Sequence, residues 1–177
     1  MLSERRTVLH VTNFQPWKDP QMPLRVLEQL RTRGHWSLRV LGDGPGAAAF
    51  DTAARNRGLA SWIERTGAVD LSRERLADGA VLLSTSRRES FGLAALEALA
   101  CGVPVVAPRL PGLDETLGDG PGAIQVTRPT PAAFALAVER GRYGDHRAGG
   151  RVLGERVDVR ASALAYLAPL AVPGLAG

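Results

Sequence analysis

Short apolar runs alternate along this chain with longer segments in which apolar residues recur every three or four positions. Runs of the first kind are typical of buried strands, and the second spacing is typical of helices with one buried face. The pattern predicts strands at Thr7–Val11, Ser37–Leu41, Trp62–Glu64, Ala80–Ser84, Val103–Ala107 and Ala123–Val126. It predicts helices at Pro20–Arg33, Gly46–Arg57, Leu71–Ala77, Gly92–Ala100, Pro131–Arg142 and Val159–Leu170.

The predicted strands and helices alternate, and the strands are mainly apolar. This combination indicates an α/β fold with a parallel sheet of about six strands and helices on both faces. We expect residues 1–177 to form a single domain. Ligands of such sheets bind beyond the carboxyl ends of the strands. Because Lys18, Gly42–Gly44, Ala68 and Glu89 all follow predicted strands, one site at this edge is expected.

Polar residues and glycines predict where several of these segments begin and end. Asp19 and Thr130 precede helical segments, and both residue types are common at the N-cap position. The segment Gly141–Gly154 is rich in Gly and Arg, and we interpret it as a loop or linker.

The stretch Glu89–Ala107, ESFGLAALEALACGVPVVA, carries the main chemical signal. Its helix contains only Gly, Ala and Leu besides one glutamate, so we expect the helix to be buried. The first helical turn leaves the N–H groups near Phe91, Gly92 and Leu93 without intrahelical partners, and the helix dipole adds positive potential there. Because Gly92 lets a ligand approach the backbone closely, this helix start is predicted to bind an anion such as phosphate.

Two carboxylates flank the predicted anion site. Glu97 is costly in an apolar helix unless it is paired or hydrated, and it lies about 7.5 Å along the helix axis from Gly92, within reach of a ribose joined to a bound phosphate. The alternative is that Glu97 lies on a narrow stripe facing solvent. For Glu89 the alternative is a capping role or a surface pair with Arg87 or Arg88.

Composition narrows the class of ligand. The chain has 177 residues, is 45% hydrophobic and 23% charged, and has a formal net charge of +4. This charge mildly favours anionic ligands or an anionic membrane surface. The arginines are scattered and no basic stripe carries aromatic residues, so nucleic-acid binding is not expected. Lys18 is the only lysine among 22 Lys and Arg residues, and a compact ammonium group suits phosphate.

The cysteine, the histidines and the longest uncharged segment argue against disulfides, a cysteine nucleophile, a metal site and a membrane span. Cys101 is the only cysteine, so no disulfide can form within the chain, and we expect it to be buried and without a nucleophilic role. The three histidines are isolated, so no metal site is expected, and we interpret His10 as a core or edge residue of a strand. The charge-free segment Ala161–Gly177 is too short to span a membrane and is interrupted by prolines.

The motif from Glu89 to Glu97, with Ser-Phe-Gly inside it and CGVPVVA after it, resembles the signature of retaining glycosyltransferases of family 4, the group 1 enzymes of GT-B fold. The resemblance extends to Leu38–Pro45 (LRVLGDGP), Arg65–Asp70 (RTGAVD) and Leu110–Leu117 (LPGLDETL), and so covers nearly the whole chain. It implies a single Rossmann-like domain, the C-terminal, donor-binding half of a GT-B fold. The N-terminal acceptor domain of the family is expected to be absent.

The resemblance also implies roles for individual residues. Glu89 would be the catalytic-site carboxylate that contacts the hydroxyls of the donor sugar, and Glu97 would hold the ribose hydroxyls. Backbone groups of Phe91, Gly92 and Leu93 would contact the sugar and the diphosphate.

Three further positions belong to the same implied site. Lys18 matches the lysine with which the family binds the diphosphate, whereas Asn13 stands where the family has an arginine. Ala68 and Val69 would lie beside the nucleotide base. The implied clamp on the diphosphate is therefore one positive charge short.

The implied function is binding of a nucleotide-diphosphate sugar for retaining transfer of a hexosyl group, without a metal or another cofactor. We expect no turnover from the chain alone, because an N-terminal acceptor domain or a partner chain would have to complete the enzyme. The alternative is a non-catalytic nucleotide-binding or interaction module descended from a glycosyltransferase. A nicotinamide-dependent dehydrogenase is disfavoured, because TNFQPWK after the first predicted strand lacks the glycines of the dinucleotide fingerprint.

The two ends of the chain predict location and association. MLSERR is not followed by an apolar segment of the kind found in signal peptides, so a cytoplasmic location is expected, with contact at the inner membrane surface left open. The apolar helix Val159–Leu170 would lack its partner domain, and we therefore expect self-association through it.

Overall fold

The computed structural model describes residues 6–67, 81–118 and 122–143, and the structural statements below concern these residues. Several predictions fall outside these residues: the helices Leu71–Ala77 and Val159–Leu170, and the site residues Ala68 and Val69.

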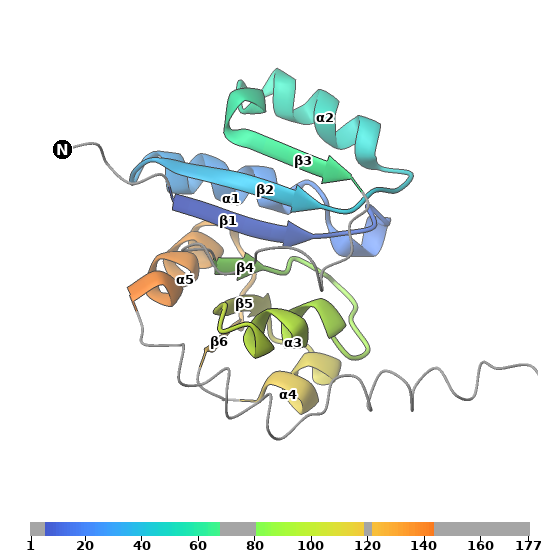
Figure 1. Ribbon diagram of the computed structural model, residues 1–177, viewed down its shortest axis with the longest axis vertical. Helices are drawn as coiled ribbons and strands as arrows, with labels where there is room; N and C mark the ends of the chain where they lie inside the picture. The colour runs from blue at the N-terminus through green and yellow to red at the C-terminus, as the bar shows by residue number, and fades with distance from the viewer. Residues whose placement is uncertain (1–5, 68–80, 119–121, 144–177) are drawn as a thin grey trace, which may run out of the picture.

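A six-stranded parallel sheet lies at the centre of the molecule, in the order β3-β2-β1-β4-β5-β6 (Figure 1). The prediction of about six parallel strands is confirmed. The strands β1 to β3 are added toward one edge of the sheet and β4 to β6 toward the other, so the strand order reverses between the parallel neighbours β1 and β4. Ligands of such sheets bind beyond the carboxyl ends of the strands at this point. The strands are β1 (Arg6–Val11), β2 (Trp36–Leu41), β3 (Ile63–Gly67), β4 (Val81–Leu83), β5 (Val105–Pro108) and β6 (Ala123–Val126).

Helices cover both faces of this sheet, as predicted. They are α1 (Met22–Arg31), α2 (Ala47–Asn56), α3 (Leu93–Ala100), α4 (Pro111–Leu117) and α5 (Pro131–Tyr143), with short 3-10 turns η1 (Pro16–Lys18) and η2 (Ala60–Trp62). Successive strand residues point to opposite faces, so Val8 joins the core beneath α1, α2 and α5, where Phe134 is buried. Its neighbour Leu9 joins a second core with Leu96 of α3 and Leu113 of α4.

The start of α1 differs from its prediction. The helix begins at Met22 with Gln21 at the N-cap position and no capping side chain, so the expectation that Asp19 caps it is wrong. Asp19 instead follows η1 in the left-handed region, at φ 46°, and its carboxylate accepts hydrogen bonds from Arg87. Thr130 does cap α5, because its Oγ1 accepts a hydrogen bond of 3.2 Å from the backbone N–H of Ala133.

Three further expectations are corrected. The segment Leu110–Leu117 contains α4, which was not predicted, because Pro111 and Gly112 look like helix breakers in the sequence although proline is well suited to a first helical turn. α5 extends to Tyr143 and takes up the start of the linker expected at Gly141–Gly154. Cys101 is exposed rather than buried, because it lies at the C-cap of α3.

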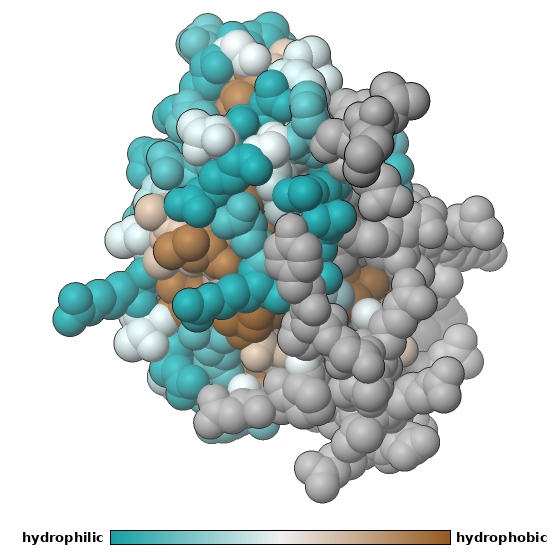
Figure 2. Space-filling view, turned by 90° about the vertical axis from the view of Figure 1, so that its left-hand side faces the viewer, coloured by the Kyte–Doolittle hydropathy of each residue, from teal (hydrophilic) through white to brown (hydrophobic). Residues whose placement is uncertain are grey.

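The face seen in Figure 2 lies on the side where the strands begin, opposite the carboxyl edge of the sheet. Its coloured surface is largely hydrophilic, with hydrophobic side chains gathered in the middle. Among the residues that the structure describes, no helix combines the length and the apolar character needed to cross a bilayer.

Candidate functional site

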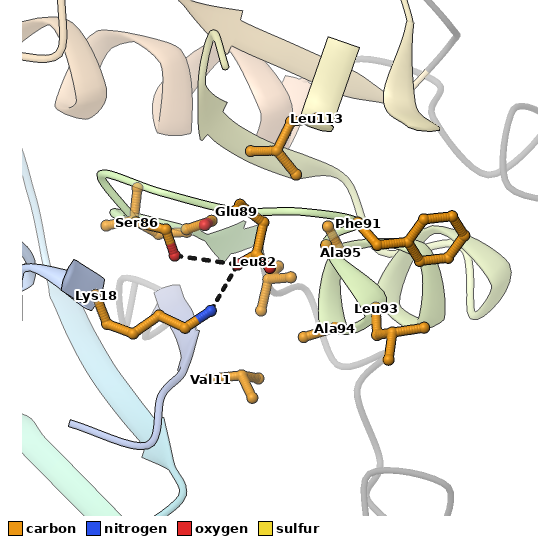
Figure 3. A pocket seen from close by; sticks show the side chains of 13 residues that line it. Val11, Lys18, Leu82, Ser86, Glu89, Phe91, Leu93, Ala94, Ala95 and Leu113 are labelled. Atoms are coloured by element: carbon orange, nitrogen blue, oxygen red, sulfur yellow. Dashed lines mark hydrogen bonds and ion pairs between the residues drawn. The ribbon is translucent and has the colours of Figure 1, made fainter. Parts of the chain in front are cut away.

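A cavity of about 350 Å³ opens at the carboxyl ends of β1 and β4, where the order of the strands reverses. Its polar side chains come from the loops after these two strands, and its apolar wall comes from α3 and α4 (Figure 3). The position is the one expected for ligands of a doubly wound sheet. The most informative lining residues are Lys18, Ser86, Glu89, Gly92, Leu93 and Leu113.

An ion pair crosses this cavity. The Lys18 ammonium lies 2.5 Å from Oε2 of Glu89, and the two side chains are 22% and 19% exposed, so both can still be reached by a ligand. Ser86 Oγ donates a second hydrogen bond of 3.3 Å to the same carboxylate oxygen. Figure 3 shows Lys18 and Ser86 converging on Glu89 from two sides. The surface pairing of Glu89 with Arg87 or Arg88, considered above, is not what the structure contains.

The backbone beneath Lys18 is held by the loop after β4. Thr85 Oγ1 donates a hydrogen bond of 2.9 Å to the carbonyl of Lys18, and the N–H of Arg87 donates one of 2.7 Å to the carbonyl of Trp17. The Arg87 side chain also pairs with Asp19. The two loops that supply the opposite charges are therefore linked to each other, not only to the sheet.

The start of α3 forms the far wall of the cavity. Gly92 is its N-cap residue at φ 72°, with no capping side chain, and Gly92, Leu93 and Ala94 all line the cavity. A left-handed N-cap and uncapped first-turn N–H groups provide a region of positive potential next to the Lys18–Glu89 pair. The ring of Phe91 points away from Glu89 in Figure 3, so its contribution to the lining is at the edge.

Helix α4 supports this wall from behind. A Cβ on Gly112 would collide with the backbone oxygens of Glu89 and Ser90, so the close approach of α4 to the loop requires glycine. A Cβ on Gly92 would collide with the Leu113 side chain. The segment Leu110–Leu117 therefore determines where the Glu89 loop lies.

A buried histidine lies beneath the site. His10 in β1 is 2% exposed, and its Nδ1–H donates a hydrogen bond of 2.9 Å to the carbonyl of Leu83 in β4. The pKa of His10 is lowered to about 4, mainly by burial; the hydrogen bond to Leu83 opposes this shift and the nearby Lys18 charge adds to it. His10 is therefore neutral at pH 7 and joins the two strands whose ends form the cavity. Of the two positions considered for His10, core or edge of the sheet, the structure shows the core.

The structure brings together five of the nine predicted site residues: Lys18, Glu89, Phe91, Gly92 and Leu93 all line the cavity. Asn13 and Glu97 do not line it. Asn13 is exposed on the loop after β1, and Glu97 is half-buried in the second turn of α3. The roles of all nine residues, including Ala68 and Val69, remain predictions.

Two parts of the site were missed in the sequence. Ser86 was not singled out, although three consecutive hydroxyl residues, Ser84–Ser86, follow a buried strand and so mark a polar strand end. The pairing of Asp19 with Arg87 had no local signal, because the two residues are far apart in the chain. Within the described ranges, no group of three or more His, Cys, Asp or Glu side chains is placed to hold a metal ion.

Solved structures share this fold. Anabaena HepE in complex with UDP-glucose superposes with a TM-score of 0.76 at 20% identity, over 93% of this chain and 50% of that one. The S. aureus protein TarM superposes with a TM-score of 0.75 at 17% identity, over 97% of this chain and 36% of that one.

Sequence comparison identifies the family. A D-inositol 3-phosphate glycosyltransferase of Streptomyces griseus is 36% identical over 149 residues, which are 77% of this chain and 31% of that protein. The chain thus spans about a third of the length of the curated relatives it matches. Residues 5–141 match the family described as glycosyl transferases group 1. The chain therefore belongs to the family of group 1 glycosyl transferases.

Proposed function

We propose that this domain binds the nucleotide-diphosphate sugar of a retaining, family 4 glycosyltransferase that transfers a hexosyl group. The observation that carries the proposal is the Lys18–Glu89 ion pair inside a cavity at the start of α3. Such a cavity offers a cation and helix N–H groups to a diphosphate, and a carboxylate to hydroxyl groups.

In this proposal the ligand replaces the ion pair. The diphosphate would take over Lys18 and the first turn of α3, and the sugar hydroxyls would donate hydrogen bonds to Glu89 in place of Lys18. Ser86, which already donates to Glu89, would keep the carboxylate oriented during the exchange. Glu97 would hold the ribose, and Ala68 and Val69 would lie beside the base.

The names of similar proteins support this class of ligand. HepE was solved with UDP-glucose, and the Streptomyces griseus relative is named as a D-inositol 3-phosphate glycosyltransferase. We therefore use UDP as the first probe. Lys18 and the start of α3 supply positive charge to the diphosphate, so we propose that binding does not depend on a metal ion and will persist in a chelator.

The chain spans about a third of the length of its curated relatives, so transfer to an acceptor is proposed only for a protein that also supplies the remaining parts of such an enzyme. The alternative function is a non-catalytic module in which the site no longer serves transfer. The observation that favours this alternative is Asn13, an uncharged residue where the family has an arginine.

The proposal is tested by calorimetric titration of the 177-residue chain with UDP and with uridine. Lys18→Ala should weaken UDP binding about tenfold to a hundredfold, the equivalent of one charge-assisted hydrogen bond of about 1.5–3 kcal/mol, and leave uridine binding unchanged. Arg25→Ala, which removes a positive charge from the exposed side of α1, is the matched control. The proposal is wrong if the chain does not bind UDP, or if the two variants behave alike.

A second variant separates the ribose from the diphosphate. Glu97→Gln keeps the shape of the side chain and removes its charge, so it should weaken UDP and uridine by the same factor. Unchanged affinities would remove Glu97 from the proposed site and leave the Lys18 result standing.

A further inference from the structure

Asp19 has an unusual backbone conformation for its residue type and burial. It lies at φ 46° and ψ 63°, in the left-handed region that favours glycine, and it is 8% exposed. Asn and Asp tolerate this region better than other residues, yet a glycine would meet the backbone requirement without a buried charge. The carboxylate of Asp19 therefore has a function that the turn alone does not require.

That carboxylate accepts two hydrogen bonds from one guanidinium group. Nε and Nη2 of Arg87 lie 3.0 and 2.8 Å from Oδ2 of Asp19. The Arg87 side chain is 71% exposed, whereas that of Asp19 is 10% exposed. The Arg87 side chain thus gains little from burial, and the contact that holds it is this pair with Asp19.

The pair lies next to Lys18 in both loops. Asp19 directly follows Lys18, and Arg87 is two residues before Glu89. The backbone bonds from Arg87 to Trp17 and from Thr85 to Lys18 run between the same two loops. The two loops are therefore linked on both sides of Lys18, at Trp17 by a backbone hydrogen bond and at Asp19 by the ion pair.

We propose that Asp19 and Arg87 are positioning residues that hold Lys18 opposite Glu89. A lysine side chain is a flexible four-carbon stem, so its ammonium group keeps a fixed position only when the backbone that carries it is also fixed. Without the Asp19–Arg87 pair, the η1 turn keeps its backbone bonds to the loop after β4 but loses the charged contact that closes it. The consequence for ligand binding rests on the proposed function, whereas the geometry of the Lys18–Glu89 pair does not.

The first experiment needs no ligand. Because Lys18 is the only lysine, lysine labelled with ¹³C at Cε gives a single side-chain signal in the NMR spectrum of the full chain. Glu89→Gln should shift this signal in the wild type, and the shift should fall by at least half in Asp19→Gly and in Asp19→Asn. Glycine accepts the left-handed backbone, so the Asp19→Gly variant should remain folded, with amide spectra that change only near the site.

The matched control is Glu139→Gln. This substitution removes another ion pair next to α1, between Arg33 and Glu139 at 3.1 Å. Glu139 lies on α5 and does not line the cavity. The Glu89→Gln shift should be unchanged in this background. An equal Glu89→Gln shift with and without the Asp19 carboxylate overturns the proposal, whether or not the chain binds nucleotides.

The second experiment measures the contribution of the diphosphate as the ratio of the uridine to the UDP dissociation constant. Asp19→Asn and Arg87→Lys should each lower this ratio several-fold with uridine binding unchanged, because a lysine cannot reproduce the two guanidinium contacts. A purely structural role would change the melting temperature and leave the ratio unchanged, and that result would overturn the positioning role. Absence of UDP binding in the wild type would instead overturn the proposed function, and the NMR result would still decide the positioning of Lys18.

Discussion

Two loops at the carboxyl edge of the sheet contain glycines that serve different purposes, close backbone packing in one loop and the wall of a cavity in the other. In the loop after β2, a Cβ on Gly42, Gly44 or Gly46 would collide with a backbone oxygen of the loop after β1, at residues 12–14. In the loop after β4, Gly92 approaches a side chain, that of Leu113, and also begins the wall of a cavity. The first loop packs backbone against backbone, and the second leaves space for a ligand.

This difference shows how much each motif says about function. The GDGP turn resembles the family motif, but its glycines are explained by packing alone. The Glu89–Glu97 motif is only partly explained by packing, because Glu89 forms an ion pair with Lys18 and accepts a hydrogen bond from Ser86 inside a cavity, where a purely structural loop would not need a charge. We expect substitutions in the first loop to act on stability, and those in the second to act mainly on binding.

The largest effect should come from Gly44→Ala. Gly44 has no positive φ, so the substitution tests space alone, and its Cβ would collide with the carbonyl of Asn13. Because backbone must move, we expect a loss of about 3 kcal/mol or more in the free energy of unfolding, measured by urea denaturation. Gly58→Ala is the matched control: φ is 67° with no atom within 4 Å of the new Cβ, so only about 1–2 kcal/mol of backbone strain is expected. Equal losses would mean that the two loops are not in close contact.

Acid should destabilise the junction between β1 and β4, and this effect should be of similar or smaller size. The pKa of His10 falls from 6.5 in the unfolded chain to about 4 in the fold, so the unfolded state binds the proton more readily. The contribution of neutral His10 is fully present above pH 6.5 and is lost as the pH falls to about 4, for a total of about 3 kcal/mol. Urea titrations at intervals from pH 7.5 to 4 measure it.

The control for the acid effect is His10→Asn. It should lower stability at pH 7 but flatten the dependence between pH 6.5 and 5, where few carboxylates titrate. A slope that persists in this variant would assign the acid sensitivity to another group.

The smallest effect on stability should come from Gly92→Ala. The new Cβ meets the movable end of Leu113, so the expected loss of about 1–2 kcal/mol comes mainly from the left-handed φ of 72°. Leu113→Ala should relieve the contact but not the strain, so the double variant should still bind UDP more weakly than Leu113→Ala alone. Normal UDP affinity in Gly92→Ala would show that the ligand does not contact the start of α3.

The sequence predicts the sheet well because strand cores are local apolar runs. The β1 and β5 segments are buried on both faces, and their patterns need no tertiary information. Helix α4 was missed because Pro111 and Gly112 carry contradictory local signals, and its existence depends on packing of Leu113 against α3.

The candidate site divides along the same line. Lys18 and Glu89 were predicted from a motif, and the structure brings them into contact. The pairing of Arg87 with Asp19, and not with Glu89, depends on how two loops distant in sequence are placed, which no local pattern contains. Cys101 was expected to be buried because its helix is apolar, but a residue at a helix end can face away from the core.

The seam between β1 and β4 has a mechanical consequence. The ladder between β1 and β2 joins six residue pairs, and in the part of the chain that the structure describes β1 also pairs with β4, Val8 with Val81 and Leu9 with Leu82. Side-chain hydrogen bonds and ion pairs also link the two halves of the sheet: His10 with Leu83, Thr85 with Lys18, Arg87 with Asp19, and Lys18 with Glu89. Separating the two halves of the sheet would break these contacts, and a molecule bound between Lys18 and Glu89 would add one more link between them.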